Sequence, residues 1–436
     1  MGMDKSVNVQ YTRDANVTRT TRNEDDSCSS LCTPPSSTEP LEIILAKDFY
    51  FGFLSVDDCE EFLVQEGDFL VRCLPDPSNS QRLLWIIAVK DVKGKIQHIP
   101  VTRDDEDQYV LMKRKFPSLV ELVHHYHTSK EIVVVSVPVV LRRTAAKPKW
   151  MLTDSSVTMF AQIGKGQGGS VWAGTFGETC QLGRRPVAIK YLHEDANPAQ
   201  VASFEKEARI HRRLSHSSIV QFVAIVIDKY PVRLVTELCD NNLKIHLKKN
   251  ASKLAQKDKI QICLDVSEGL EYLIGKGYVH RDIAARNCLM KQGRVRITDL
   301  GLAVRFANLK PTEVGPEKLP IKTTAPEGLI CKVFSEKSDV WAFGVLMWEV
   351  FTGGAEPYED LINRLDKRNW GNLLVANILA GYRMPIPLGT PKNVESVIKN
   401  CWQRNPVKRP TFHMVRKMLS NKSTKKWYQR LPMLKK

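Results

Sequence analysis

The sequence lacks any apolar run that approaches the roughly 20 residues needed to cross a bilayer. The longest candidate, IVVVSVPVVL at 132–141, is short and contains Pro138. The polar N-terminus has no secretory signal pattern, and no internal repeat is visible. These absences argue against a membrane-spanning protein, a secreted protein and a repeat array. They favour a protein of the cytoplasm.

The chain has fewer acidic than basic residues, with 48 Asp and Glu and 64 Lys and Arg, which gives a formal net charge of +16. Neither an aromatic RNA-binding pattern nor zinc-finger spacing accompanies this charge, so we predict no nucleic-acid partner. The ten cysteines form no regular framework, which is typical of reduced thiols in the cytosol. The start, MGMDKS, fits N-myristoylation of Gly2. One acyl chain anchors only weakly, so weak peripheral contact with the inner face of the plasma membrane is the alternative.

Composition divides the chain into five segments. Residues 1–45 are rich in Ser, Thr, Asn, Asp and Pro and read as a disordered leader. The pattern becomes globular at 46–143, and a short basic linker follows at 144–156. Residues 157–420 begin with short strands and continue with long helical stretches, and 421–436 form a basic tail.

In the first globular segment, DFLVRC places Arg72 on the same strand face as Leu70, within an apolar run. A buried guanidinium needs an anionic partner, and a structural Arg–carboxylate pair is one alternative. The motifs FYFG, GKIQHIP and FPSLVELV follow the order of a Src-homology-2 (SH2) domain, which this region resembles.

The SH2 resemblance implies a central antiparallel sheet flanked by two helices. It also implies that Arg72 and His98 bind phosphotyrosine, and Ser78 and Ser80 are candidates to supply further hydroxyls. Val56 stands where such domains usually have a second Arg, which predicts weaker binding of the phosphate.

Further on, Gly164, Gly166 and Gly169 form G-x-G-x-x-G within IGKGQGGSVWAGTF. A dinucleotide-binding fold shares this pattern, but there a helix would follow the glycines. Here the strand-like SVWAGTF follows, which indicates a glycine loop between two strands that covers phosphates. The predicted nucleotide-binding residues of this loop are Ile163, Gly164, Lys165, Gly166, Gln167, Gly168, Gly169, Ser170 and Val171.

The next motif, VAIK, places Ala188 and Lys190 on one face of a strand, so Ala188 contacts a base and Lys190 reaches a phosphate. A helix should then begin at the N-cap Asn197. Glu207 falls at the edge of the apolar stripe of this helix. It either points inward to pair with Lys190 or remains a surface Glu.

The stretch VHRDIAARNCLM at 279–290 resembles the catalytic loop of a protein kinase. TDLG, APE at 325–327, SDVWAFGVLMWEV and KRPTF follow in family order, and the resemblance implies a pairing of Glu327 with Arg409. It further implies an α+β fold with a bilobal kinase domain that uses ATP and Mg²⁺. The implied catalytic residues are Asp282, Lys190, Glu207 and Arg286; the metal ligands are Asn287 and Asp299; and the nucleotide contacts add Thr236, Glu237, Cys239 and Leu289.

The substrate is predicted to be tyrosine in proteins. Serine/threonine kinases usually carry Lys two residues after the catalytic Asp, whereas Ala284 stands here and Arg286 follows in the tyrosine-kinase form AARN. An SH2 domain followed directly by this kinase domain resembles the C-terminal half of the Fes/Fps/Fer family of non-receptor tyrosine kinases. Partners would be phosphotyrosine-containing proteins, bound by the SH2 domain, and protein substrates with tyrosine.

Several positions depart from the kinase pattern, although the catalytic set is intact. There is no tyrosine between Asp299 and Ala325 to be phosphorylated. The other departures are Gly168 for an aromatic residue, Leu300 for Phe, Thr323 for Trp, and His211 where an apolar residue is expected; Glu313 is a candidate mimic of the missing phosphotyrosine. They motivate the alternative of a weak or inactive kinase that acts as a phosphotyrosine-binding adaptor. The short linker suggests that the SH2 domain braces the small lobe.

Overall fold

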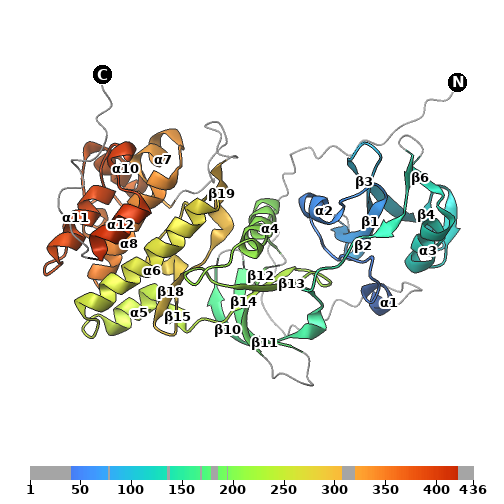
Figure 1. Ribbon diagram of the computed structural model, residues 1–436, viewed down its shortest axis with the longest axis horizontal. Coiled ribbons are helices and arrows are strands. Elements are labelled where there is room, and N and C mark those ends of the chain that lie inside the picture. Colours follow the sequence, from blue (N-terminus) through green and yellow to red (C-terminus); the bar gives the residue numbers. More distant parts are fainter. Residues whose placement is uncertain are drawn as a thin grey trace.

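A computed structural model describes residues 41–76, 79–134, 138–166, 169–177, 185–193, 195–306 and 320–420. The described chain forms an N-terminal domain, a small sheet-rich lobe and a large helical lobe arranged in a row (Figure 1). The small lobe lies between the other two and contacts both. The predicted α+β organisation is confirmed.

The N-terminal domain is built around a six-stranded sheet with the order β5-β4-β3-β2-β1-β8. The strands β1 to β5 are antiparallel neighbours, and alternate residues of β1 and β2 face opposite sides of the sheet. One face packs in a core with α3, and the other packs against α2. The elements are α2 (Val56–Phe62), β1 (Asp68–Asp76), β2 (Asn79–Lys90), β3 (Ile96–Arg103), β4 (Tyr109–Leu111), β5 (Arg114–Phe116), α3 (Leu119–Ser129), β6 (Ile132–Val134), β7 (Val139–Val140) and β8 (Arg143–Thr144).

The end of the predicted leader is ordered, so the expectation of disorder through residue 45 is wrong for its last turn. A short helix, α1 (Leu41–Leu45), precedes the domain, and Ile44 is only 1% exposed. Its side chain joins the core that contains Phe69 and Tyr126. Burial of an apolar side chain offsets the entropy of ordering the segment.

The predicted linker also takes part in both neighbouring sheets. Within it, β9 (Met151–Leu152) pairs in parallel with β13 of the small lobe. At its start, β8 pairs in parallel with β1 of the N-terminal domain. The connection is therefore held at both ends by strand pairing.

The small lobe has the sheet order β10-β11-β12-β14-β13-β9. Its helix α4 begins as predicted, since Asn197 caps it and Pro198 occupies its first turn. The capping box between Asn197 and Gln200 satisfies backbone donors at this end. The elements are η1 (Asp154–Ser156), β10 (Val157–Lys165), β11 (Gly169–Phe176), β12 (Arg185–Leu192), α4 (Pro198–Arg212), β13 (Phe222–Val226) and β14 (Arg233–Glu237).

The large lobe is mainly helical and surrounds α8, most of whose residues are buried. Its remaining strands are β15 (Asn241–Asn242), β16 (Tyr278–Val279), β17 (Cys288–Lys291), β18 (Arg294–Ile297) and β19 (Val304–Arg305), with η2 (Ala285–Asn287), η3 (Leu300–Leu302) and η5 (Pro406–Lys408) between them. Its helices are α5 (Leu243–Asn250), α6 (Gln256–Gly275), α7 (Pro326–Cys331), α8 (Glu336–Phe351), α9 (Glu359–Ile362), α10 (Trp370–Ala380), α11 (Lys392–Cys401) and α12 (Phe412–Leu419).

A buried ion pair ties the large lobe together. Arg409 donates two hydrogen bonds to Glu327, at 2.7 and 2.8 Å, and also bonds the carbonyl oxygens of Gln403 and Lys337. The predicted pairing of Glu327 with Arg409 is thereby confirmed. None of the helices in the described ranges combines the length and apolar character that a membrane span requires.

Candidate active site

The small lobe contributes a buried ion pair. Nζ of Lys190 on β12 lies 2.6 Å from Oε2 of Glu207 on α4, which confirms the inward orientation of Glu207. Burial raises the pKa of Glu207, and the ammonium group of Lys190 opposes this rise. Oδ1 of Asp299 lies 4.0 Å from the same Nζ, and the Asp299 side chain is half exposed. The three groups therefore meet where the two lobes face each other.

The glycine-rich segment lies between two strands, as predicted. β10 and β11 pair across it, so a strand rather than a helix follows the glycines. Gly169 is required for sheet packing, because a Cβ atom there would lie 2.4 Å from the carbonyl oxygen of Tyr191. Ser170 is buried, and its hydroxyl lies 3.0 Å from Nε2 of His193. Gln167 and Gly168 lie outside the described residues.

The other predicted nucleotide contacts lie on β12, on and just after β14, and on β17. Ala188 on β12 lies opposite Thr236 on β14. The Glu237 side chain turns away into an ion-pair network, 2.6 Å from Lys291 and 3.1 Å from Arg296. The side chain of Glu237 is thus held by two cations and faces away from a nucleotide, and its backbone N–H bonds the carbonyl oxygen of Gln221 at 3.0 Å. Cys239 and Leu289 are partly exposed at the junction of the lobes.

Asp282 lies on the large lobe, and both of its carboxylate oxygens accept hydrogen bonds. Nδ2 of Asn287 donates to Oδ2 at 2.7 Å, and Nη2 of Arg286 donates to Oδ1 at 2.5 Å. Oγ1 of Thr323 lies 3.4 Å from Oδ1. Because its amide nitrogen faces Asp282, Asn287 keeps its amide oxygen as a potential cation ligand.

Two buried carboxylates on α8 hold the backbone of this loop, and sequence reasoning did not assign them a role. Asp339 accepts bonds from the backbone N–H groups of His280 and Arg281, at 2.7 and 2.9 Å. Glu349 accepts from the N–H of Ala285 at 2.8 Å. Burial raises the pKa of both carboxyls, that of Glu349 to about 7. The sequence did contain a signal for such a role, because Asp339 and Glu349 are acidic residues within the otherwise apolar segment SDVWAFGVLMWEV.

Two residues that depart from the kinase pattern, Leu300 and His211, are buried in the core. Leu300 is fully buried, so it packs where Phe is usual. His211 is 1% exposed, and burial lowers the pKa of its imidazole to about 4, so the ring is neutral near pH 7. The proposed mimic Glu313 lies outside the described residues.

In the N-terminal domain, Arg72 is 2% exposed, and its Nη1 donates to the carbonyl oxygen of Leu54 at 2.9 Å. His98 lies on β3, diagonally across β2 from Arg72. Burial lowers the pKa of His98, and the nearby Arg72 lowers it further, which places the two groups together. Ser78 and the Ser80 side chain lie outside the described residues.

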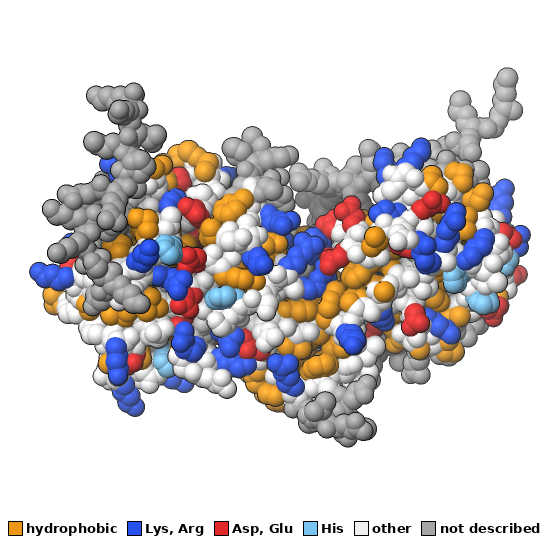
Figure 2. All heavy atoms as spheres, viewed as in Figure 1, with side chains coloured by type: hydrophobic (Ala, Val, Ile, Leu, Met, Phe, Trp, Pro, Cys, Tyr) orange, Lys and Arg blue, Asp and Glu red, His pale blue; other side chains and the backbone are white. Residues whose placement is uncertain are grey.

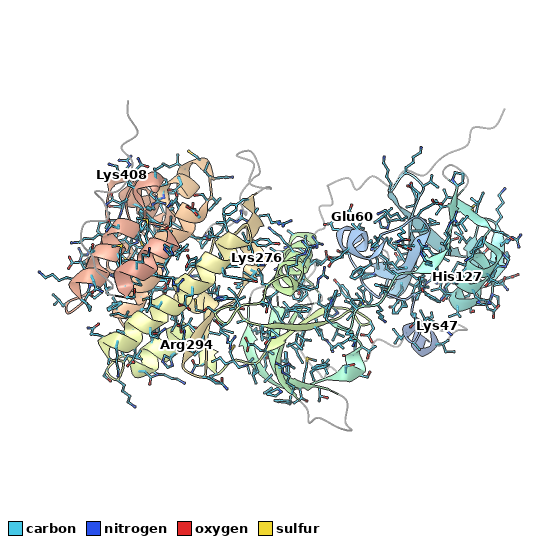
Figure 3. The ribbon with its side chains drawn as sticks, viewed as in Figure 1. Lys47, Glu60, His127, Lys276, Arg294 and Lys408 are labelled. Carbon is cyan, nitrogen blue, oxygen red and sulfur yellow. The ribbon has the colours of Figure 1, made fainter. Side chains whose placement is uncertain are left out.

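Helix α2 of the N-terminal domain docks on α4 of the small lobe. Nε of Arg209 lies 2.8 Å from Oδ1 of Asp58, and Nη2 lies 3.1 Å from Oγ of Ser55. Arg212 pairs with Glu61 on the next turn. Basic and acidic side chains face each other at this junction, where Glu60 marks α2 (Figures 2 and 3).

Comparison with known proteins agrees with this architecture. The family model of protein tyrosine and serine/threonine kinases matches residues 157–419, and the SH2 domain model matches 49–126. Fer-related kinase 1 of Caenorhabditis elegans is 32% identical over 381 residues, which cover 86% of this chain and 94% of that protein.

Two longer relatives are also similar. Human tyrosine-protein kinase Fer is 30% identical over 377 residues, covering 86% of this chain and 44% of Fer. The transforming protein Fps of Fujinami sarcoma virus is 31% identical over 370 residues, covering 84% of this chain and 40% of Fps. The chain thus spans less than half the length of these two relatives. It belongs to the protein tyrosine kinases, in the Fes/Fps/Fer-like group that joins an SH2 domain to a kinase domain.

Proposed function

We propose that this chain transfers the γ-phosphoryl group of ATP to tyrosine residues of protein substrates. The observation that carries the proposal is the environment of Asp282, whose carboxylate is oriented by Asn287 and Arg286 on the lobe opposite the Lys190–Glu207 pair. Asp282 accepts the proton of the tyrosine hydroxyl as the oxygen bonds the γ-phosphorus. The bond from that phosphorus to the bridging oxygen breaks, and ADP leaves.

Several residues of the chain position the nucleotide. Lys190, held by Glu207, reaches the phosphates, and the glycine-rich segment covers them with its backbone. The base lies between Ala188 and Leu289, against the hinge at Thr236, Glu237 and Cys239. Two carboxylates from α8 keep the catalytic loop in place.

Magnesium fits the residues present. Asp299 and Asn287 offer a half-exposed carboxylate and an amide oxygen, the oxygen ligands that this cation prefers. When bound there, magnesium neutralises phosphate charge during transfer.

The test is phosphotyrosine formation by the purified chain with magnesium-ATP and a tyrosine-containing polymer, beside Asp282→Asn. Transfer by the parent and a loss of at least about 10³-fold in the variant are expected, because the general base and its orientation are removed. Equal background signals from both proteins would instead support the adaptor function.

We infer that the SH2 domain binds phosphotyrosine-containing proteins and braces the small lobe through α2 and α4. The Asp58–Arg209 pair supports this, because Arg209 lies on the helix that carries Glu207. Asp58→Arg and Arg209→Asp should each lower kcat/KM several-fold, and the double variant should recover most of the loss. If neither single variant changes kcat/KM, the domain does not brace the lobe.

The proposed location is the cytoplasm, with acylated Gly2 as the route to weak contact with the inner face of the plasma membrane. Gly2 lies outside the described residues. The intact mass of the protein from eukaryotic cells, compared with that of Gly2→Ala, tests for the acyl chain.

A further inference from the structure

Helix α4 contacts the turn that follows Asp299. Oγ of Ser203 lies 3.3 Å from the carbonyl oxygen of Gly301, to which it donates a hydrogen bond. Ser203 precedes Glu207 by four residues, so the two side chains lie on the same face of α4, one turn apart. The helix that supplies Glu207 to the ammonium group of Lys190 therefore also reaches the segment of the proposed magnesium ligand.

The surroundings of Gly301 show how closely these groups converge. A Cβ atom there would lie 3.1 Å from Oγ of Ser203. It would also lie 3.7 Å from Oδ1 of Asp299 and 3.7 Å from Oε2 of Glu207. Because glycine has no side chain, the backbone of the turn can approach α4 this closely. A hydroxyl group, the proposed metal ligand and the ion-paired glutamate thus surround one backbone position.

The turn depends on support from its neighbours, because Asp299 has a left-handed backbone conformation. Its φ is 62° and its ψ is 66°, values that a residue with a Cβ atom rarely adopts. Such a conformation persists where the surrounding structure holds it. The large lobe supplies part of this support, since Nε2 of His280 lies 3.1 Å from the carbonyl oxygen of Thr298 and Leu300 is fully buried. Ser203 holds the turn from the opposite lobe.

We propose that Ser203 is a positioning residue for magnesium binding, whose hydroxyl holds the turn at Gly301 and thereby fixes the Asp299 carboxylate before the cation arrives. The inference deepens the proposed kinase function and rests on it. The Asp299 side chain is half exposed, and its distance of 4.0 Å from Nζ of Lys190 is longer than a direct hydrogen bond. The direction of the carboxylate is therefore set largely by the backbone of the turn.

Prior positioning of a ligand lowers the cost of binding. Without the bond from Ser203, the turn populates other conformations, and the cation binds only the fraction that is competent. Once bound, the cation itself holds the Asp299 carboxylate. The effect of Ser203 therefore falls on the magnesium concentration that is required, and much less on the rate at saturating magnesium. A merely structural role in α4 would disturb Glu207 and lower the rate at every magnesium concentration.

The test is the affinity of the full chain for a non-hydrolysable ATP analogue, measured by calorimetry over a series of magnesium concentrations and in EDTA. For Ser203→Ala, the magnesium concentration that gives half of the affinity gain should rise roughly three- to tenfold, as expected for loss of one neutral hydrogen bond beside a metal ligand. The affinity in EDTA should equal that of the parent. Alanine has the higher helix propensity, so unwinding of α4 does not explain such a loss.

Ser203→Thr and Ser203→Val form an isosteric pair, in which only threonine keeps a hydroxyl. Ser203→Thr should retain most of the magnesium response of the parent, and Ser203→Val should respond like Ser203→Ala. Because both variants add the same methyl group, the difference between them reports the hydroxyl even if the methyl group shifts both baselines. Equal magnesium responses of these two variants would contradict the proposal.

Ser267→Ala is the matched control. Its hydroxyl also donates to a carbonyl oxygen, that of Leu264 at 2.8 Å, but within α6 of the large lobe. This variant should respond to magnesium like the parent. In an Asp299→Asn background, Ser203→Ala should change the magnesium response no further, because Ser203 acts through Asp299.

Steady-state kinetics with a tyrosine peptide provide a second measurement. The kcat of Ser203→Ala at saturating magnesium should stay within about twofold of the parent value. A loss of kcat that saturating magnesium does not restore would overturn the positioning role. Equal magnesium responses of the parent, Ser203→Ala and Ser203→Val would overturn it too, and would leave the proposed function standing.

The outcomes for the parent separate the two proposals. If the parent binds the analogue in a magnesium-dependent manner but forms no phosphotyrosine, the proposed function fails, and the calorimetric series still decides the role of Ser203. If the parent neither binds the analogue nor forms phosphotyrosine, the proposed function fails and the role of Ser203 fails with it.

Discussion

Oγ1 of Thr323 lies 3.4 Å from Oδ1 of Asp282, and 3.1 Å from the carbonyl oxygen of Pro320. The hydroxyl has one proton, so it donates to one of these acceptors at a time. Thr323 is 2% exposed and stands where Trp is usual in tyrosine kinases. The substrate-side loop of this protein thus contacts the proposed catalytic base directly.

Thr323→Val should lower kcat by roughly three- to tenfold, because a buried hydrogen bond to a carboxylate is lost while the side-chain shape is kept. Thr323→Ser should retain most of the rate. The measurement is steady-state kinetics with a tyrosine peptide.

Thr324→Val provides the matched control for that experiment. The Thr324 hydroxyl is also buried and also bonds the carbonyl oxygen of Pro320, at 3.0 Å. Equal losses in Thr323→Val and Thr324→Val would show that the effect comes from the loop and not from contact with Asp282.

Gly52→Ala should separate the SH2 domain from the small lobe. Gly52 has φ +57°, and a Cβ atom there would lie 2.0 Å from the carbonyl oxygen of Ile227. The same oxygen accepts a bond from Phe53 N–H at 2.9 Å. We expect faster tryptic cleavage after Lys149 and lower kinase activity.

The control for Gly52 is Gly94→Ala. Gly94 has φ +77°, but a Cβ atom there meets nothing within 4 Å. Both variants therefore carry the left-handed backbone strain of about 1–2 kcal/mol, and only Gly52→Ala adds a clash between domains. Equal cleavage rates in the two variants would contradict this account.

Glu349→Gln should change the pH dependence of stability. The pKa of Glu349 in the folded protein is about 7, mainly through burial, against opposing effects of the Ala285 N–H, Lys244 and Arg286. Because this pKa is raised, the stability it contributes is present at low pH and is lost as the pH rises toward 7. The free energy of unfolding of the variant, relative to that of the parent, should therefore rise by roughly 1–3 kcal/mol from about pH 5 to about pH 8, as measured by urea unfolding. A constant difference across that range would refute the assignment.

His211→Leu should act with the opposite sign. Burial lowers the pKa of His211 in the folded protein to about 4, from an ordinary value of 6.5. As the pH falls below 6.5, the imidazole is therefore protonated in the unfolded chain before it is protonated in the folded protein. The parent therefore loses stability as the pH falls toward 4, and the variant should lose less. The exposed His124, changed to Leu, is the control in the same unfolding series and should behave like the parent.

Local motifs were sufficient to identify the candidate site residues. The strand and helix periodicities named Lys190 as the partner that an inward Glu207 would need, beside the alternative of a surface Glu, and the two groups lie 2.6 Å apart. The N-cap of α4 was equally readable, because capping depends on neighbouring residues. The roles of Asp339 and Glu349 were not predicted, since their partners are backbone N–H groups 59 and 64 residues away.

By itself the sequence determined the order of the domains, the strand and helix types, and the candidate site residues, because each depends on spacing within a short segment. Only the tertiary structure decided that Ile44 joins the SH2 core, that Thr323 contacts Asp282, and that Phe204 and Ala208 of α4 share a core with Leu70. These contacts arise where surfaces from distant segments bury apolar area together. This burial also brings charged side chains such as Arg209 and Asp58 into contact, and no local sequence pattern predicts which ones will meet.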